Sequence, residues 1–378
     1  MQVSIWEKES FYAHNDVVII GSGFVGLWSA YFLKLASPSL RVLILDRGII
    51  PTGASTRNAG FACFGSLTEL MHDASAMNTD SMLQLVEMRY KGLKKIRKIL
   101  SKKKIDYNTC GGYELITNKE DESVRILKGK IQWLNSLLRK IVKYEQVFTL
   151  ADKKIKKFGF AKVDHLVANS LEGYLHPGKL CHQLMLLVQS MGVLILNTIE
   201  IKSFEKNGDI ISLQSNLPAT LTADQILICT NGFAKQLLPD LDILPARGQI
   251  LLTSPINDLK IKGTFHADEG FYYFRNLGSR ILLGGARNQA FEEESTNEMN
   301  TSDKIQKELE RYLSECILPG KSYTIEQRWS GIMGMGREKM PIIRELRPGV
   351  FCAVRMSGMG VALAPVVGEK VAKMMSRT

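Results

Sequence analysis

The sequence lacks an apolar run long enough to cross a membrane. Among its 378 residues, no stretch approaches the ~20 consecutive apolar residues of a membrane-spanning helix. The densest apolar segment, residues 184–196, is interrupted by Gln189 and Gly192. The first fifteen residues carry Glu7 and Lys8 and have no apolar centre of the kind that a secretory signal requires. We therefore expect a cytoplasmic protein without a membrane span.

Cysteine and histidine are too scattered to form a metal-binding motif. The six cysteines, at positions 63, 110, 181, 229, 316 and 352, lie at least 36 residues apart. This spacing excludes the C-x-x-C pairs of zinc ribbons and thioredoxin-like sites. The six histidines form no H-x-H or H-E-x-x-H pair. The sequence therefore predicts no metal.

Acidic residues are too few to balance the basic ones. Lys and Arg number 49 against 38 Asp and Glu, a net charge of +11, and much of the excess falls in residues 91–104 and 153–157. A basic surface can bind nucleic acid or an acidic membrane. No nucleic-acid-binding motif accompanies the charge, so we interpret the clusters as a solvated helix face and a lysine-rich loop. Nucleic acid is not an expected partner, although attraction of an anionic substrate stays open.

The sequence contains enough apolar residues to form two hydrophobic cores. Its 45% hydrophobic residues and its length predict two globular domains. A buried strand at 17–20 runs into Gly21-Ser22-Gly23-Phe24-Val25-Gly26, and a helical pattern follows. A second buried strand is predicted at 42–45, and Asp46 follows it directly. Strand, glycine turn, helix, strand and acid fit within the length of one βαβ unit.

The G-x-G-x-x-G turn favours dinucleotide binding for steric and electrostatic reasons. Gly21 permits the tight turn, and Gly23 lets the backbone approach a pyrophosphate at the helix N-terminus. Gly26 lets the helix sit close on the strand. Asp46, twenty residues later, is placed to accept the ribose hydroxyls. A strand–helix turn without a ligand would not explain why all these features occur together.

The following segment favours FAD over NAD. Residues 53–61 are small and polar, and they can start a helix whose N-terminus faces a phosphate. Gly60 leaves space for a flat ring. In a nicotinamide-linked dehydrogenase this stretch would more often be plain helix.

Further elements follow from periodicity and turn residues. Residues 80–145 are predicted to be helical around a break at Gly111-Gly112. The other predicted helices are 177–191, 302–316 and 364–375, and the other predicted strands are 193–196, 210–214, 225–229, 249–253, 270–275, 280–284 and 350–354. Two α/β regions thus flank mixed and antiparallel segments, which predicts a discontinuous nucleotide-binding domain.

Several ordered blocks resemble the D-amino-acid oxidase (DAO) superfamily of FAD enzymes, in particular its glycine oxidase, sarcosine oxidase and γ-glutamylputrescine oxidase branch. The resemblance covers nearly the whole chain. The blocks are Trp6-Glu7, the G-A-S-x-R-N-x-G segment at 53–60, Cys229-Thr230-Asn231-Gly232, Pro245-Ala246-Arg247-Gly248-Gln249, Gly284-Gly285, Trp329-Ser330-Gly331 and Ser357-Gly358-Met359-Gly360-Val361.

The resemblance implies an α/β fold with a Rossmann-like FAD-binding domain and a second domain built on a mixed or antiparallel sheet. The FAD-binding domain would comprise residues 13–75, 155–240 and 328–378. The substrate-binding domain would comprise 76–154 and 241–327, and residues 1–12 would form an N-terminal lead. Sequence alone gives no oligomeric state.

The resemblance also implies a non-covalent FAD. Relatives attach their flavin through a cysteine in the Trp-Ser-Gly block, where this chain has Met333 and Met335, or through a histidine in the segment at 53–61, which has none. The residues implied to bind FAD are Gly21, Ser22, Gly23, Phe24, Val25, Gly26, Asp46, Arg47, Ser55, Arg57, Asn58, Ala59, Gly60, Phe61, Ile201 (in the strand after Gly192), Thr230, Asn231, Gly232, Gly331, Ser357, Gly358, Met359, Gly360 and Val361.

The expected substrate pocket departs from the family. By alignment, Met333 stands where glycine oxidases carry a carboxylate-binding arginine, and Phe271 stands where they carry a tyrosine. Without that arginine a small amino acid loses a charge-assisted anchor, so an amine is the favoured substrate. The residues predicted to line the pocket are Phe271, Tyr272, Met333 and Met356, and those that could replace the arginine are Arg275, Arg337 and Arg355.

Three other side chains near the flavin blocks are assigned no role in the reaction. Cys63 is expected near the ring as an inert small hydrophobe. Glu338 and Lys339 could act as acid or base but are expected on the surface.

The resulting hypothesis is an FAD-dependent oxidoreductase acting on a small-molecule amine or amino acid. A hydride would pass from the α-carbon to flavin N5, the imine would hydrolyse to a carbonyl, and O2 would be the acceptor. No catalytic residue is assigned. Three alternatives stay open: a flavoprotein that has lost turnover and acts as a binding or regulatory protein, an NAD-linked Rossmann dehydrogenase, and a tRNA-modifying role suggested by the basic surface.

Overall fold

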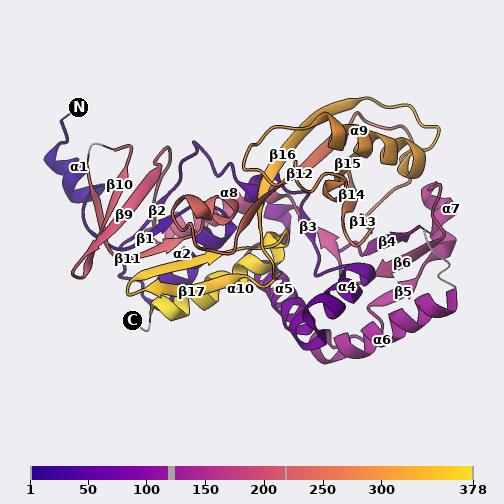
Figure 1. Cartoon of the computed structure of the whole chain (residues 1–378), viewed down its shortest axis with the longest axis horizontal. Helices are drawn as coiled ribbons and strands as arrows, with labels where there is room; N and C mark the ends of the chain where they lie inside the picture. The colour runs from indigo at the N-terminus through magenta and orange to yellow at the C-terminus, as the bar shows by residue number, and fades with distance from the viewer. Residues whose placement is uncertain (1, 118–123, 218, 377–378) are drawn as a thin grey trace.

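A computed structural model describes residues 2–117, 124–217 and 219–376. Two large sheets lie at opposite ends of the molecule, and both chain termini lie at the end that holds the first sheet (Figure 1). Each large sheet has eight strands among the described residues, and a two-stranded sheet accompanies them.

The first sheet has a parallel centre. Its order is β17-β18-β11-β1-β2-β8, and the hairpin β9–β10 pairs with β11. Strands β18, β11, β1, β2 and β8 run parallel, while β17 is antiparallel to β18. The bounds are β1 (Asn15–Ile20), β2 (Val42–Leu45), β8 (Leu194–Leu196), β9 (Ile201–Asn207), β10 (Ile210–Ser215), β11 (Leu221–Ile228), β17 (Ile342–Arg347) and β18 (Val350–Val354).

Both faces of this sheet are covered, as its continuous apolar strands predict. Val17 and Ile19 of β1 pack with helices on one face, and Val18 and Ile20 belong to a second cluster with the β9–β10 hairpin. The helices on the first face are α2 (Phe24–Ala36), α5 (Thr79–Ile99), α8 (Pro177–Ser190) and α10 (Gly360–Met375). The α/β fold with a Rossmann-like sheet is therefore confirmed.

The second sheet is mostly antiparallel. Its order is β16-β12-β15-β14-β13-β4-β6-β5, and only β13–β4 among these pairs is parallel. The bounds are β4 (Gly112–Ile116), β5 (Phe148–Leu150), β6 (His165–Asn169), β12 (Leu244–Thr253), β13 (Thr264–Ala267), β14 (Tyr272–Leu277), β15 (Arg280–Gly285) and β16 (Ile325–Met335). Helices α4 (Leu67–Met77), α6 (Val124–Val142) and α9 (Asp303–Tyr312) lie at this end (Figure 1).

The remaining α-helices and strands of the described residues are short. They are α1 (Ile5–Ser10), α3 (Ala54–Arg57), α7 (Ile155–Phe158), β3 (Phe61–Ala62) and β7 (Gly173–Tyr174). No helix in the described ranges is long and apolar enough to cross a membrane.

One element differs from its prediction. The range 80–145 is not helical throughout, because β4 lies between α5 and α6, and residues 118–123 of that range lie outside the described residues. Strand β4 pairs with β13 and β6, which are distant in sequence. Its five residues carry too little periodicity to reveal those partners. The predicted domain boundaries stay predictions.

Candidate active site

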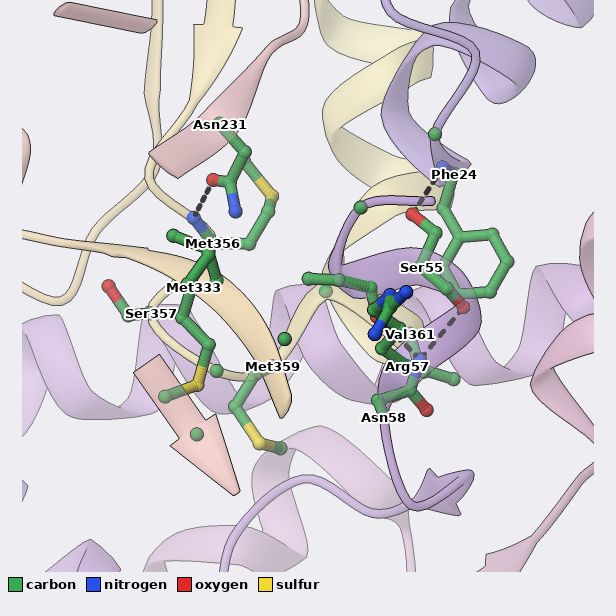
Figure 2. A pocket seen from close by; sticks show the side chains of 18 of the residues that line it. Phe24, Ser55, Arg57, Asn58, Asn231, Met333, Met356, Ser357, Met359 and Val361 are labelled. Atoms are coloured by element: carbon green, nitrogen blue, oxygen red, sulfur yellow. Dashed lines mark hydrogen bonds between the residues drawn. The ribbon is translucent and has the colours of Figure 1, made fainter. Parts of the chain in front are cut away.

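A cavity of about 540 Å³ runs between the two sheets. One end is lined by the turn after β1, the end of β2 and the segment 52–61, and the other end by strands of the second sheet. The start of α2 and the segment 55–58 face Met333, Met356 and Met359 across it (Figure 2). Its volume lies within the range typical of small-molecule sites.

The glycine turn leaves a helix N-terminus open toward this cavity. Gly21 has φ +108°, and Gly23 is the N-cap of α2 without a side-chain cap. The Phe24 N–H donates to Ser55 Oγ at 2.9 Å. A Cβ on Gly26 would lie 2.0 Å from the Gly21 carbonyl oxygen, so this position packs helix against strand. Uncapped N–H groups of this kind bind phosphate.

Asp46 stabilises the same turn. Its Oδ2 accepts the Ser22 N–H at 2.9 Å and the Ser22 hydroxyl at 2.6 Å, and its Oδ1 accepts the Gly48 N–H at 2.9 Å. Asp46 and Arg47 both line the cavity, and the Arg47 guanidinium lies 4.0 Å from the centre of the Phe233 ring. Asp46 therefore holds the turn and faces the cavity.

The segment 53–61 is held by its own polar side chains. The Asn58 amide donates to the carbonyls of Ala54 and Ser55, while its oxygen accepts the Gly60 N–H at 2.8 Å. Arg57 donates to the Thr52 carbonyl through Nε and to the Ser330 carbonyl through Nη1. The uncapped start of α3 thus lies against the cavity in a fixed position.

A third uncapped helix start faces the cavity from the C-terminal block. Met359 is the N-cap of α10 without a side-chain bond, after Ser357 at φ +46° and Gly358 at φ +79°. Asn231 Oδ1 accepts the backbone N–H groups of Arg355 at 3.1 Å and Met356 at 3.3 Å. Figure 2 shows the bond to Met356. The hydroxyl oxygens of Ser357 and Thr230 are buried, and no described residue hydrogen-bonds them. These unsatisfied groups fit a polar ligand.

Most predicted cofactor residues line the cavity, but three do not. Ser22 and Gly26 act within the turn, as described above. Gly232 packs on β16, since a Cβ there would lie 2.7 Å from the Met333 carbonyl oxygen. Ile201 lines the cavity but begins β9, whereas the strand after Gly192 is β8, so its predicted element is corrected. Contact of these residues with FAD stays a prediction.

The substrate end corrects the prediction for Tyr272. Phe271, Met333 and Met356 line the cavity, and so does Tyr273. Tyr272 points to the other face of β14, where its hydroxyl donates to Glu308 Oε1 at 2.6 Å. Side chains alternate along a strand, so the pair that faces the cavity contains Tyr273 rather than Tyr272.

Sequence reasoning missed Arg287, which lines the substrate end. Its guanidinium lies 4.8 Å from the centre of the Phe291 ring, and it donates no hydrogen bond to another described residue. Burial lowers its pKa, but an arginine stays charged. Arg287 lies two residues after the Gly284-Gly285 block, and this position was the signal in the sequence that could have identified it.

The three arginines that the sequence offered as carboxylate anchors do not face the cavity. Arg275 is buried and donates from Nε to the Ala59 carbonyl at 2.7 Å, so it is not a surface residue. Arg355 is buried against Asp242 at 2.8 Å. The Arg337 side chain is 92% exposed. None of the three lines the cavity.

The surface position expected for Lys339 is wrong. It lines the cavity and pairs with Asp73 at 2.5 Å, while Glu338 is exposed. Glu69 lies 3.7 Å from the Lys339 ammonium and also lines the cavity. Burial by itself raises the pKa of Glu69, but Arg89 and Lys339 outweigh burial and hold it below the usual value. The cavity wall therefore carries an ionised carboxylate beside a lysine.

Comparisons with known proteins agree on one family. A family model described as FAD dependent oxidoreductase, DAO, matches residues 16–374. The probable oxidoreductase OrdL of Rhizobium meliloti is 23% identical over 368 residues, which are 95% of this chain and 82% of that protein. The bifunctional protein ThiO/ThiG of Trichormus variabilis is also 23% identical, across 95% of this chain and 52% of its own length.

Solved structures share the fold. L-proline dehydrogenase from P. horikoshii has a TM-score of 0.78 at 19% identity, covering 96% of this chain and 94% of its own. Glycine oxidase from Bacillus cereus has a TM-score of 0.76 at 17% identity, with coverages of 96% and 97%. Since the family model spans nearly the whole sequence, this chain belongs to the DAO family of FAD-dependent oxidoreductases.

Proposed function

We propose that the protein oxidises the C–N bond of a small amine that carries a carboxylate. When bound, FAD would accept a hydride from the substrate α-carbon, and the imine would hydrolyse to a carbonyl compound and an amine, with O2 as the acceptor. Family membership and the geometry of the cavity support this proposal. The observation that carries it is the charged Arg287 guanidinium at the substrate end, without a protein hydrogen-bond partner among the described residues.

The chain's own residues divide the cavity into a cofactor end and a substrate end. The uncapped start of α2 would hold the pyrophosphate, and Asp46 would accept the ribose hydroxyls. The uncapped start of α10 and the Ser357 hydroxyl would face the pyrimidine edge of the flavin, where they stabilise negative charge. The substrate would lie between Tyr273, Met333 and Arg287.

Arg287 changes the substrate expected from sequence. Met333 removes the family's arginine from β16, but Arg287 offers a guanidinium to the same cavity from the turn after β15. An arginine–carboxylate pair is often bidentate and is stronger than a neutral hydrogen bond. The Glu69 carboxylate on the cavity wall is already paired with Arg89 and Lys339. The guanidinium of Arg287 therefore favours a substrate with a carboxylate over a simple amine.

An anaerobic titration of the FAD-loaded protein tests the proposal. We expect amino acids or N-substituted amino acids to bleach the flavin. Substitution R287M should raise the apparent Kd for such a substrate about 10- to 100-fold, since a hydrogen bond to a charged group contributes about 1.5–3 kcal/mol. The matched control is R337M, because Arg337 is exposed away from the cavity.

The other outcomes are equally informative. Bleaching by amines without a carboxylate, equal in wild type and R287M, would remove Arg287 from the proposal and restore the amine substrate favoured by Met333. A flavin that dithionite reduces but no compound in a broad panel reduces would favour a flavoprotein without turnover.

A further inference from the structure

Three buried side chains with metal-ligating atoms meet beside the substrate end of the cavity. Cys63 follows β3, Glu172 precedes β7, and His266 lies in β13. One thiol sulfur, one carboxylate oxygen and one ring nitrogen lie within 4.8 Å of one another. The three residues are 4%, 1% and 6% exposed, respectively. A cluster of this kind differs from the scattered carboxylates of a protein surface, which water and counter-ions satisfy.

One side of the cluster packs against the protein, and the other side faces the cavity. Glu172 does not line the cavity, and it packs on the backbone of β4, where a Cβ on Gly112 would lie 2.4 Å from its carboxyl carbon. One Glu172 oxygen lies 2.6 Å from His266 Nε2. Cys63 and His266 line the cavity. Three ligands can therefore hold an ion while its remaining coordination position faces the cavity.

We propose that Cys63, Glu172 and His266 bind a Zn²⁺ ion whose fourth position is open to the substrate cavity. Thiolate, imidazole and carboxylate are the three ligand types that zinc takes in proteins, and three protein ligands with one open position is its usual exposed arrangement. The thiolate and the carboxylate together carry two negative charges, which the ion neutralises. This balance matters because an uncompensated charge at these buried positions is costly.

Zinc binding requires the three side chains to adjust their spacing, since their ligand atoms now lie within 4.8 Å of one another. Ligand atoms in a tetrahedral zinc site lie about 3.3 Å apart, so the pair of Glu172 oxygen and His266 Nε2, now 2.6 Å apart, must open slightly. The ion displaces the thiol proton of Cys63 and any proton on the ligating ring nitrogen. Water, or an amine or carboxylate from the cavity, completes the shell.

X-ray absorption on the zinc-loaded, FAD-containing wild-type protein tests the donor set. After equilibrium dialysis against Zn²⁺, we expect one zinc per chain, with one sulfur at about 2.3 Å and nitrogen or oxygen ligands at about 2.0–2.2 Å. Pairs such as His14–Asp224 and His165–Asp152 could also collect zinc, but they contain no sulfur. A shell without sulfur, or no retained zinc, would overturn the proposal.

Variants locate the site. Cys63→Ser and His266→Gln should each weaken zinc binding at least tenfold, because each removes one ligand. Cys110→Ser is the matched control, since Cys110 is an exposed free thiol outside the cluster. Equal zinc affinity in all three variants would contradict the assignment. Should a cluster variant lose FAD or fail to fold, the donor set of the Cys110→Ser protein still decides, because a zinc-bound sulfur in that protein cannot come from the exposed thiol. This readout needs no assay of oxidation.

Discussion

At the scale of single residues, Gly26 bears most directly on the predicted FAD site. A Cβ at this position would lie 2.0 Å from the Gly21 carbonyl oxygen, which belongs to the turn itself. We expect Gly26→Ala to displace α2 from the turn, to destabilise the protein by about 1–3 kcal/mol and to lower its FAD content. Thermal unfolding and the flavin absorbance of the purified protein measure both effects.

Gly129 provides the control for this substitution. It is an exposed residue of α6 outside the cavity lining, and a Cβ there meets nothing within 4 Å. Gly129→Ala should therefore keep its FAD and lose no stability, since alanine favours a helix over glycine by about 1 kcal/mol. Similar FAD contents in the two variants would show that close packing of α2 is not what the site requires.

Residues differ in how far sequence predicts them. Gly26 and Asp46 belong to a local pattern whose physical reason can be stated from spacing alone. The structure packs Gly26 against the turn and bonds Asp46 to Ser22 of that turn, while contact of Asp46 with a ribose stays a prediction. Arg287 and the Cys63 cluster are brought to the cavity by pairing between strands distant in sequence. The sequence predicted the wrong face of the strand for Tyr272. The pattern Phe-Tyr-Tyr-Phe is aromatic at every position and does not reveal which side chains face the cavity.

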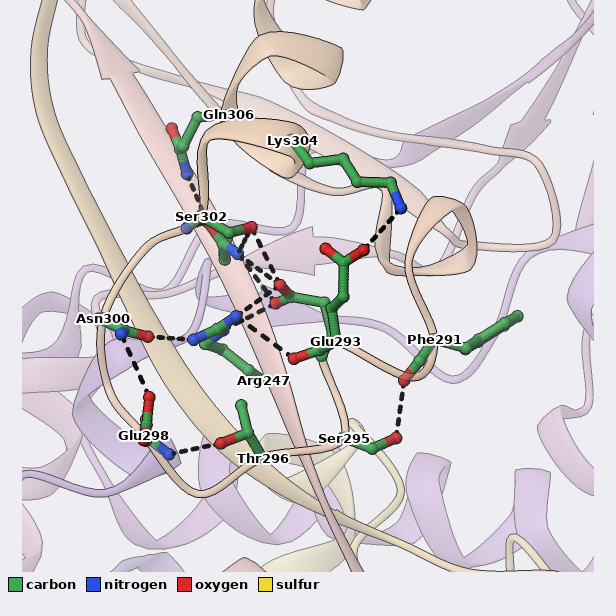
Figure 3. Close-up of polar contacts among 12 residues, drawn as sticks. Arg247, Phe291, Glu293, Ser295, Thr296, Glu298, Asn300, Ser302, Lys304 and Gln306 are labelled. Carbon is green, nitrogen blue, oxygen red and sulfur yellow. Dashed lines mark hydrogen bonds and ion pairs between the residues drawn. The ribbon is translucent and has the colours of Figure 1, made fainter.

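At the scale of elements, the connection between β15 and α9 is held by one buried carboxylate. Glu294 is fully buried and accepts from Arg247 Nε at 2.9 Å and Nη2 at 2.7 Å, and also from Gln249 and Ser302. Figure 3 shows the network between this connection and Arg247 of β12. The same connection carries Arg287, Phe291 and Met299 to the cavity. Glu294 therefore positions the proposed substrate anchor.

We expect Glu294→Gln to loosen this connection. Removing one partner of a buried ion pair leaves the other charge uncompensated, which costs about 3–5 kcal/mol. Thermal unfolding should show the loss, and hydrogen exchange should rise in residues 286–302. Glu293→Gln is the neighbouring control, because Glu293 pairs with Lys304 in solvent and such pairs contribute about 0–1 kcal/mol. Equal exchange in the two variants would show that the Glu294 network does not hold the connection.

The buried Glu294–Arg247 pair also predicts how the stability of the protein changes with pH. Burial alone raises the pKa of Glu294, but Arg247 and the other donors outweigh it and hold this pKa below its usual value. A lowered pKa in the folded state adds stability at high pH that is lost as pH falls. The stability difference between wild type and Glu294→Gln should thus be full above about pH 5 and shrink below the ordinary glutamate pKa of about 4.3. Urea unfolding at several pH values measures it, and a difference that grows on acidification would contradict the assignment.

Elements were predictable where local pattern and tertiary structure agree. The helix at 177–190 begins at a proline after His176, whose side chain caps it, and both signals are local. Strand β4 has five residues, and its identity comes from its pairing with β13 and β6. Such a strand acquires its conformation from partners that a single-sequence pattern does not contain.

At the scale of the whole molecule, the cavity joins the two sheets, so FAD should link their stabilities. Its walls come from β1, β2 and residues 229–231 after β11 on one side, and from β12 to β16 on the other. A ligand that binds only the folded state stabilises it by about 2.7 kcal/mol at 100 times its Kd. Removing FAD should therefore lower the Tm of the protein, and adding it back should raise the Tm with concentration.

ADP separates the two ends of the cavity in the same experiment. It carries the adenosine and pyrophosphate groups that would meet the α2 turn and Asp46, but nothing that reaches the α10 start or β16. At equal free concentration we expect ADP to raise the Tm of the flavin-free protein less than FAD does, because ADP leaves the contacts with the second sheet unmade and therefore binds more weakly. Equal shifts would mean that the flavin end adds no stabilisation. The two sheets would then be held together by protein contacts alone, and the unsatisfied Ser357 hydroxyl would need another partner.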